Sequence, residues 1–445
     1  MIQLPENVKF IIQTITDAGY EAFAVGGCIR DSILGREPED WDITTSATPL
    51  QIKELFRRTI DTGIAHGTVT VMLDKEGFEV TTYRIDGEYE DSRHPKEVTF
   101  TASLKEDLRR RDFTINAMAY NDEVGLVDIF DGKKDIERKM IRCVGNPIER
   151  FTEDALRMMR AVRFSAQLDY EIEEQTKKAI CKLAPNLVNI SAERIQTELV
   201  KLVISPHPEK LLVAYETDIT KVILPEFDAC MKTRQKNPYH CYNVGEHTIK
   251  SMEAVRADKV LRLAMLFHDF GKPVKWTTDE NGIDHFYGHP EISEEMTRQI
   301  LRRLKFDNET LRIVTALVKF HDMDINPAAK SIRRSILKTG EDIFPLLLEV
   351  KRADMEAQSS FSYEKKLELL QAINKAYEEV LEAEQCVSLK TLAVTGRDLM
   401  QKLNMPPGKE IGEILKQLLD YVIEEPAHNQ KELLLEKAME YRTTE

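Results

Sequence analysis

Two aspartates, Asp40 and Asp42, stand two positions apart in the segment EDWDITT. In an extended strand, residues i and i+2 project from the same face, so these carboxylates would repel each other unless a cation lay between them. A carboxylate pair that shares a metal with substrate phosphates is a typical Mg²⁺ site. A solvated strand end with spare acidic side chains would have the same spacing, so the residues around the pair must decide.

A glycine pair precedes the aspartates. Gly26 and Gly27 follow the apolar run AFAV and precede IRDSILG, which is the pattern of a strand, a tight turn and a helix. Glycines at such a turn let backbone N–H groups approach a triphosphate, and a helix N-terminus adds positive potential. Glu79, in the strand-like GFEVTTYR, offers a third carboxylate. The order of these features predicts a two-metal phosphoryl-transfer site with Asp40, Asp42 and Glu79 as its acids.

The elements that must position these residues change along the chain. Residues 1 to about 140 mix strand-like runs, such as TVTVMLD, with helical ones, whereas beyond ERFTEDALRMMRAVRF apolar residues recur at helical spacing. The predicted fold class is therefore α+β, a mixed head followed by helices. Proline-containing breaks near 235 and a polar stretch near 360 predict four domains, at 1–145, 146–235, 236–358 and 359–445.

Composition narrows the class of protein. The 445 residues carry a net charge of −14, which counts against a nonspecific nucleic-acid binder, yet residues 133–163 hold nine Lys or Arg against five Asp or Glu. Any RNA partner would therefore be bound locally. No apolar run approaches the roughly 18 residues of a membrane span, the N-terminus lacks the form of a signal peptide, and the six cysteines show no C-x-x-C spacing. We expect a cytoplasmic protein with no membrane partner.

Five motifs in order resemble one known family. GGCIRD…EDWD, RRDFTINAMAY, DIFDGKKDIERKMIR, FTEDALRMMRAVRF and SAERIQTEL, within residues 20 to about 225, are similar to the motifs of the class II tRNA nucleotidyltransferases. That family comprises CCA-adding enzymes and bacterial poly(A) polymerases of the polymerase β superfamily. The resemblance implies a polymerase β-like head, a helical neck that binds the nucleotide base and RNA, and addition of CCA to tRNA from CTP and ATP without a template.

The resemblance also implies roles for individual residues. Asp40 and Asp42 would bind catalytic Mg²⁺, with Glu79 as the third acid. The nucleotide would be bound by Gly26, Gly27, Arg30, Arg111, Asp112, Asn116, Asp154, Arg157, Arg160 and Arg163.

Base choice is expected to reside in Asp154 and Arg157. We expect Glu153 and Asp154 to open a helix, so that Asp154 and Arg157, three positions apart, share one helical face. Adenine and cytosine both present an amino donor beside a ring-nitrogen acceptor, which a carboxylate and a guanidinium in fixed order can bind.

Histidines gather in the middle of the chain: six of the ten lie between residues 240 and 321. With Asp354 they resemble the ordered H…HD…D ligands of the HD phosphohydrolase superfamily. The resemblance implies that His247, His268, Asp269 and Asp354 bind a divalent metal such as Mn²⁺ or Ni²⁺, with a possible phosphohydrolase activity. His289 and the pair His321-Asp322 would complete a second metal site or bind phosphate.

Several functions stay open. An enzyme that adds only the terminal A, or a poly(A) polymerase, would share the head motifs. An enzyme that adds only CC is disfavoured, because the family's CC-adding members lack the loop that DGEYEDSRHP, residues 86–95, supplies here. A chain that is chiefly an HD-type nucleotide phosphohydrolase would leave the neck motifs unexplained. The tail, with Pro406-Pro407 between its helices, resembles that of CCA-adding enzymes and is expected to contact tRNA. The oligomeric state is not predicted.

Overall fold

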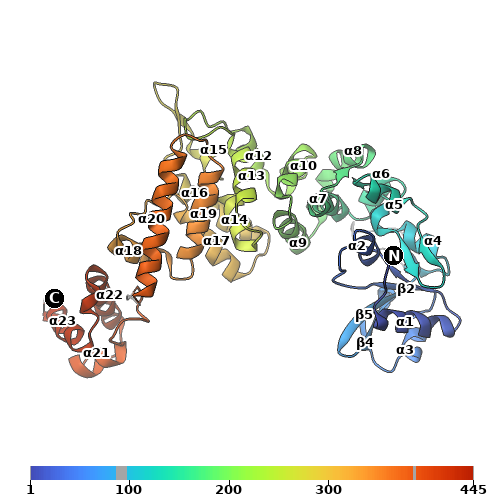
Figure 1. Cartoon of the computed structure of the whole chain (residues 1–445), viewed down its shortest axis with the longest axis horizontal. Helices are drawn as coiled ribbons and strands as arrows, with labels where there is room; N and C mark the ends of the chain where they lie inside the picture. Colours follow the sequence, from blue (N-terminus) through green and yellow to red (C-terminus); the bar gives the residue numbers. More distant parts are fainter. Residues whose placement is uncertain (1, 87–97, 384–386, 444–445) are drawn as a thin grey trace. The chain divides into compact units, whose positions relative to one another are not determined.

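The computed structural model describes residues 2–86, 98–383 and 387–443. The chain forms two compact units, Met1–Pro225 and Glu226–Glu445, and Figure 1 shows the elements of each in order of colour. None of the helices in the described ranges is long and apolar enough to cross a membrane.

A seven-stranded mixed sheet forms the head of the first unit. Its order is β3-β4-β5-β2-β1-β8-β9, and β2 and β5 run parallel whereas the other neighbours are antiparallel. The strands are β1 (Ala22–Val25), β2 (Ile43–Thr45), β3 (Thr59–Gly63), β4 (Thr68–Leu73), β5 (Glu76–Thr82), β8 (Ala119–Asn121) and β9 (Gly125–Val127). β6 (Arg84–Asp86) pairs with β7 (Val98–Phe100), and β10 (Met140–Ile141) with β11 (Glu171–Ile172).

Alternation along β5 shows why these residues form a strand with one buried face. Phe78, Val80 and Thr82 are buried whereas Glu76 and Glu79 are exposed, which is the period of two that a half-covered strand requires. In α1 (Glu6–Asp17) the buried residues recur every three or four positions, as one face of a helix requires: they are Val8, Ile11, Ile12 and Ile15. The helix packs beside β1.

Helices form the rest of the first unit. They are α2 (Gly27–Ile33), α3 (Pro49–Leu55), α4 (Leu104–Arg109), α5 (Gly132–Glu137), α6 (Pro147–Glu153), α7 (Leu156–Leu168), α8 (Glu174–Leu183), α9 (Ala192–Val203), α10 (Leu211–Glu216) and α11 (Thr220–Ile223). α7 is mostly buried and packs against α9. Asn146 begins α6 by accepting a hydrogen bond from the Ile148 amide, with proline as the first helical residue.

The second unit is almost entirely helical. Its helices are α13 (Val244–Ala254), α14 (Lys259–Phe267), α15 (Lys272–Lys275), α16 (His289–Arg303), α17 (Asn308–Phe320), α18 (Ala329–Thr339), α19 (Phe344–Glu356), α20 (Tyr363–Glu382), α21 (Gly396–Leu403), α22 (Lys409–Glu424) and α23 (Lys431–Thr443), while α12 (Pro225–Lys232) begins at the boundary. α14 packs against α13, α17 and α19, and α19 packs against α13 and α17 as well. α21 to α23 form a separate buried cluster that includes Leu399, Leu418 and Leu434.

The α+β fold class is confirmed, with the seven-stranded sheet in the head and Pro406-Pro407 between α21 and α22 as expected. The second unit contains one short antiparallel pair, β12 (Thr277–Thr278) and β13 (Asp284–His285). One local expectation is wrong: Asp40 and Asp42 lie just before β2 and not within a strand. The segment 86–95 lies almost wholly outside the described residues. The structure divides the chain into two compact units, and the finer division into four domains stays a prediction.

Candidate functional site

The register of the central strands brings Asp42 and Glu79 together. In the parallel pair of β2 and β5, Ile43 lies opposite Val80, and both side chains are buried. Because successive side chains alternate between the two faces, the preceding residues, Asp42 and Glu79, turn toward the opposite face. The amide of Val25, the last residue of β1, donates to the carbonyl of Asp42 at 3.0 Å, so the glycine turn after β1 begins beside this pair.

Three carboxylates share one pocket at this place. Asp40, Asp42 and Glu79 line a pocket of about 710 Å³. The pKa of Asp42 is raised, although its side chain reaches the surface. The largest cause is the partial loss of hydration of the carboxylate; the positive charge of Arg111 opposes the shift, and the carboxylate of Asp40 adds to it. Burial and then the charges of Asp42 and Asp40 raise the pKa of Glu79. Three mutually repelling oxygen donors fit a hard divalent cation.

The glycine turn lies against Arg111. Gly26 has φ +88°, which favours glycine, and a Cβ there would lie 3.1 Å from an Arg111 guanidinium nitrogen. Arg30 donates to Asn116 Oδ1 at 2.7 Å and to both carboxylate oxygens of Asp31. A side chain at Gly26 would therefore crowd Arg111, and the guanidinium groups of Arg30 and Arg111 border the turn.

A buried carboxylate that the sequence reading missed joins the strand to these arginines. Asp107 of α4 is fully buried; it accepts hydrogen bonds from Thr44 of β2 at 3.1 Å, from Arg110 Nε at 2.9 Å and from Arg111 at 3.4 Å. Burial opposes the charge of Asp107, yet Arg110 and Arg111 hold its pKa below the ordinary value. Asp107 thus fixes Arg111 relative to the strand that follows Asp42.

The expected helix start at Glu153 and Asp154 is wrong. α6 ends at Glu153, Asp154 is extended with φ −141° and ψ 103°, and α7 begins at Leu156. Asp154 and Arg157 therefore do not share a face of one helix. The reason is local: α6 already begins at Pro147 behind its Asn146 cap, and the Asp154 side chain accepts from the Leu156 amide at 3.0 Å, which competes with the helical hydrogen bonds.

The side chains of Asp154 and Arg157 nevertheless line one cleft, and each is held by a third residue and not by the other. Asp154 accepts from Arg194 of α9 at 2.7 Å. Arg157 donates to Glu153 at 2.7 Å and to the carbonyl of Arg110 at 3.1 Å. Their positions are therefore fixed before any ligand arrives.

The Phe164 ring lies beside one arginine of α2 and two arginines of α7. The guanidinium carbons of Arg30, Arg160 and Arg163 lie 5.1, 5.4 and 4.0 Å from the centre of its ring. Arg160 also makes an ion pair with Asp112 at 2.6 Å. Burial opposes ionisation of Asp112, but Arg160 lowers its pKa to about 2.

One open cleft of about 520 Å³ collects all ten residues predicted to bind the nucleotide, together with Asp42. Sequence reasoning missed Arg110, Phe164, Arg194 and Lys201, which also line it. Arg194 stands in the motif SAERIQTEL, so the signal was present, but nothing local showed that its partner would be Asp154.

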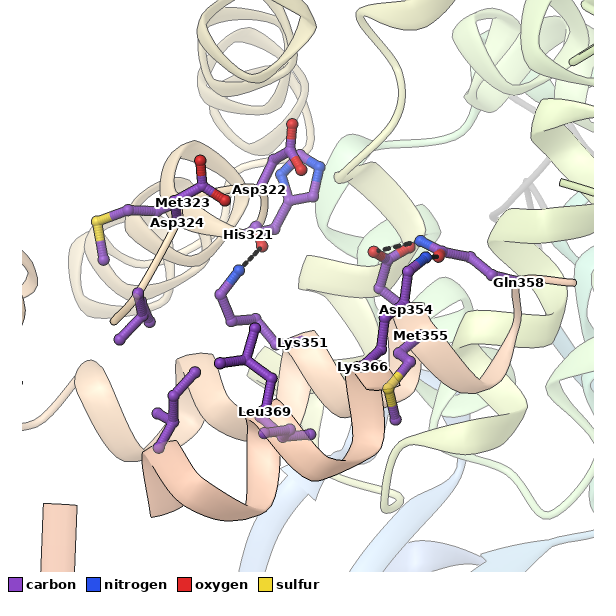
Figure 2. A pocket seen from close by; sticks show the side chains of 13 residues that line it. His321, Asp322, Met323, Asp324, Lys351, Asp354, Met355, Gln358, Lys366 and Leu369 are labelled. Atoms are coloured by element: carbon purple, nitrogen blue, oxygen red, sulfur yellow. Dashed lines mark hydrogen bonds between the residues drawn. The ribbon is translucent and has the colours of Figure 1, made fainter. Parts of the chain in front are cut away.

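A second cluster of chemically active side chains lies in the second unit. His247, His268 and Asp354 form one group whose ligand atoms lie within 4.8 Å of one another, and Asp269, His289 and His321 form another. The four predicted metal ligands and two of the three proposed additional residues are therefore brought together. Asp322 lines the adjacent pocket instead (Figure 2). That the cluster hydrolyses phosphate esters stays a prediction.

Comparisons with known proteins agree with this geometry. Residues 22–142 match the family described as the poly A polymerase head domain, residues 169–231 a probable RNA and SrmB-binding site of polymerase A, and residues 274–438 a putative tRNA nucleotidyltransferase domain 2. The CCA-adding enzyme of Pediococcus pentosaceus is 36% identical over 430 residues, which cover 97% of this chain and 96% of that protein.

Further relatives support the same family. The CCA-adding enzyme of Enterococcus faecalis is 34% identical, over 97% of this chain and 95% of its own. The crystal structure of the Bacillus stearothermophilus CCA-adding enzyme in complex with CTP matches with a TM-score of 0.71 and 29% identity, and covers 98% of this chain and 96% of its own. The family as a whole uses a divalent metal, which fits the three carboxylates around Asp42. The chain therefore belongs to the CCA-adding enzymes, a family of tRNA nucleotidyltransferases.

Proposed function

We propose that this chain adds C, C and A in turn to the 3′ ends of tRNA, from CTP and ATP and without a template strand. The observation that carries the proposal is the position of Asp42, which lines both the carboxylate pocket and the basic cleft of the neck. A triphosphate in the cleft would therefore reach the carboxylates, where a 3′ hydroxyl can attack its α-phosphorus.

Asp40 and Asp42 are the proposed Mg²⁺ ligands, with Glu79 as the third acid. Two Mg²⁺ ions bound there would activate the attacking hydroxyl and stabilise the charge that develops in transfer. Burial first, and then the like charges of the neighbouring carboxylates, raise the pKa values of Asp42 and Glu79, so a cation bound among them would relieve the repulsion. In the reaction the 3′ oxygen forms a bond to the α-phosphorus, the bond to the bridging oxygen breaks, and pyrophosphate leaves.

The triphosphate is proposed to lie against Gly26, Gly27 and Arg111. Arginine matches phosphate oxygens with paired N–H donors, and the absence of a side chain at Gly26 leaves the backbone open to the ligand. Asp112 and Asn116 are proposed to meet the ribose, beside Arg30. Since Asp112 already accepts from Arg160, Asn116 and the Phe113 amide, its second role is to fix Arg160 in the cleft.

The base is proposed to be read by Asp154 and Arg157. The carboxylate would accept from the amino group of adenine or cytosine, and the guanidinium would donate to the neighbouring ring nitrogen. Guanine and uracil present the reverse order of donor and acceptor, so each would leave buried polar groups unpaired. The separate partners Arg194 and Glu153 support this reading, because they hold both side chains in place without pairing them to each other.

Three tRNA substrates distinguish this function from its rivals. Purified protein receives tRNA that lacks CCA, tRNA that ends in C and tRNA that ends in CC, with CTP and ATP supplied separately and together. We expect CTP alone to complete CC on the first two, and ATP alone to extend only the third. Extension of the third alone under every condition would indicate an A-adding enzyme, and repeated A addition to any RNA a poly(A) polymerase. No addition to any of the three would contradict all these readings.

Because tRNA, CTP and ATP are molecules of the cytoplasm, we also place the protein there. Cell fractionation with a tagged chain tests this placement.

A further inference from the structure

An aromatic residue, Trp41, stands between the two proposed metal ligands and has no role in the nucleotide site described above. It lines the carboxylate pocket of about 710 Å³ with Asp40, Asp42 and Glu79, and its side chain is half-buried. The described residues that line the basic cleft do not include it. An indole at the edge of a polar pocket offers a large apolar face to whatever enters that pocket.

The carboxylate pocket and the basic cleft share Asp42 but differ in charge. Seven arginines and one lysine line the cleft. Among the described residues that line the pocket there is no lysine or arginine, and five are acidic: Glu39, Asp40, Asp42, Glu76 and Glu79. Two Mg²⁺ ions would offset the charge of the three proposed ligands, but Glu39 and Glu76 would remain negative. The cleft therefore suits phosphates, whereas the pocket suits an uncharged group.

The proposed reaction needs a place for the attacking strand. In an in-line displacement the 3′ hydroxyl approaches the α-phosphorus from the side opposite the leaving pyrophosphate. With the triphosphate in the cleft and Asp42 bordering both cavities, this approach lies through the carboxylate pocket. The pocket has the size of sites that hold small ligands. The last nucleoside of the tRNA is therefore the group expected to enter it.

The lining of the pocket matches the two sides of a nucleoside. Pro5, directly before α1, and Phe78 of β5 add apolar surface beside Trp41. The faces of a nucleic-acid base are apolar in the same way. Ribose hydroxyls are donors, and the carboxylates and the side chain of Asn7 in the pocket can accept from them.

The base at the end of the tRNA changes during synthesis. The first cytidine is added to the tRNA's own last nucleotide, the second to a cytidine, and the adenosine to another cytidine. A site that bound one base by its hydrogen-bonding edge would reject the others, because each base presents its own donors and acceptors. Stacking on an aromatic ring tolerates every base, since all of them have a π-face. An indole meets this requirement.

We propose that Trp41 is the platform on which the last base of the tRNA stacks, so that the 3′ hydroxyl lies beside Asp40 and Glu79. This inference rests on the proposed function and deepens it: the acceptor strand has a nucleoside pocket of its own, separate from the phosphate cleft of the incoming nucleotide. Glu39 and Glu76 keep the phosphates of free nucleotides out of that pocket.

Fluorescence tests the contact apart from activity. The chain contains two tryptophans, and Trp276 lies in the other compact unit, so Trp276→Phe leaves Trp41 as the only emitter in the full chain. With Mg²⁺ and no nucleotide, we expect tRNA that ends in CC to quench this emission. CTP alone should not change it, nor should the same tRNA shortened by its unpaired 3′ nucleotides, whose binding is confirmed by filter binding. Equal quenching by the shortened tRNA, or none by the tRNA that ends in CC, would overturn the proposal.

Steady-state kinetics test the consequence for each substrate. Trp41→Ala should raise the KM for tRNA by about ten-fold and leave the KM for CTP within about two-fold, because only the acceptor strand touches the ring. Trp41→Phe keeps an aromatic face and should recover most of this loss. Phe10→Ala removes a ring that is 55% exposed on the same head outside the pocket, and it should change neither constant. An unchanged KM for tRNA in Trp41→Ala, or an equal rise in both constants, would contradict the platform.

The outcomes separate this inference from the proposed function. Wild-type protein that extends no tRNA refutes the proposed function itself. Wild-type protein that adds CCA, while Trp41 shows neither the quenching nor the change in KM, refutes the platform alone. Circular dichroism checks the fold of each variant. If Trp41→Ala does not fold, the quenching measured in the Trp276→Phe chain decides.

Discussion

At the scale of single residues, Asp42 connects binding with chemistry. It lines the carboxylate pocket and the basic cleft, which is the proposed nucleotide site, at once. A substitution that removes the negative charge of Asp42 and keeps the shape of its side chain tests whether this charge binds the proposed metal.

We expect Asp42→Asn to abolish nucleotide addition while the affinity for tRNA stays within about two-fold, because the charge at the proposed metal site is lost and the proposed RNA contacts lie elsewhere. Incorporation of labelled CTP and a filter-binding assay measure the two quantities. Asp61→Asn, which alters an exposed carboxylate paired with Lys53, serves as the control. Addition at nearly the wild-type rate would remove the metal assignment.

Arg157 is the residue on which base choice is predicted to depend. Arg157→Ala should weaken the use of CTP and ATP and narrow their advantage over UTP and GTP by about ten-fold, which corresponds to about 1.4 kcal/mol. The ratio of kcat/KM values for the four nucleotides measures the change. Arg157→Lys keeps the charge but not the paired donors, so it should lose selectivity as well. Unchanged selectivity in both variants would place base choice in other residues.

At the scale of elements, Asp107 links strand β2 to helix α4 and through it to Arg111. Asp107→Asn breaks a buried ion pair, so we expect a loss of about 3–5 kcal/mol in the free energy of unfolding. It should also raise KM for CTP, because Arg111 loses its anchor. Urea denaturation and steady-state kinetics measure the two effects, with the neighbouring Glu106→Gln as control. A lower stability with unchanged KM would show that Asp107 only supports the fold.

Asp112 joins the segment after α4 to Arg160 of α7, and this contact depends on pH. Arg160 lowers the pKa of the buried carboxyl to about 2, below the value of about 3.9 in an unfolded chain. The unfolded chain therefore binds more protons between these values, so the stabilisation is complete above about pH 4 and is lost as the pH falls toward 2.

Asp112→Asn should remove this contribution and flatten the decline of the free energy of unfolding between about pH 4 and pH 2. Urea denaturation at a series of pH values measures the slope. Glu123→Gln, an exposed carboxyl of the same head, should keep the wild-type slope. A wild-type slope in Asp112→Asn would show that the ion pair does not stabilise the fold.

At the scale of the whole molecule, each compact unit has its own buried residues and its own cluster of ionisable side chains. The head cluster includes Phe23, Tyr83 and Leu108, and the tail cluster includes Leu418 and Leu434. Two sites in separate units should therefore fail separately.

We expect Asp269→Asn to abolish phosphate-ester hydrolysis while CCA addition stays within about two-fold of the wild type, and Asp42→Asn to do the reverse. Both activities are measured on the same preparations, with circular dichroism to confirm folding. Loss of both activities in either folded variant would argue for one shared site.

Local sequence determined much of this protein. The periods of hydrophobic residues predicted a mixed head and helices after it, and the ordered motifs picked out ten residues that line one cleft and histidines that lie in one cluster. These features could be predicted because side-chain chemistry and spacing within one element are local properties. The same locality misled the prediction at Asp154, where α6 ends at Glu153 and the Asp154 side chain accepts from the Leu156 amide, so that α7 begins only at Leu156.

Only the tertiary structure decided which residues meet. The parallel register of β2 and β5 puts Glu79 beside Asp42, the packing of α7 on α9 gives Asp154 its partner Arg194, and the helix ends of the second unit place Asp269 between two histidine pairs. Each of these contacts joins residues that are distant in sequence. Their geometry depends on how whole elements pair and pack, and no pattern within one element records that.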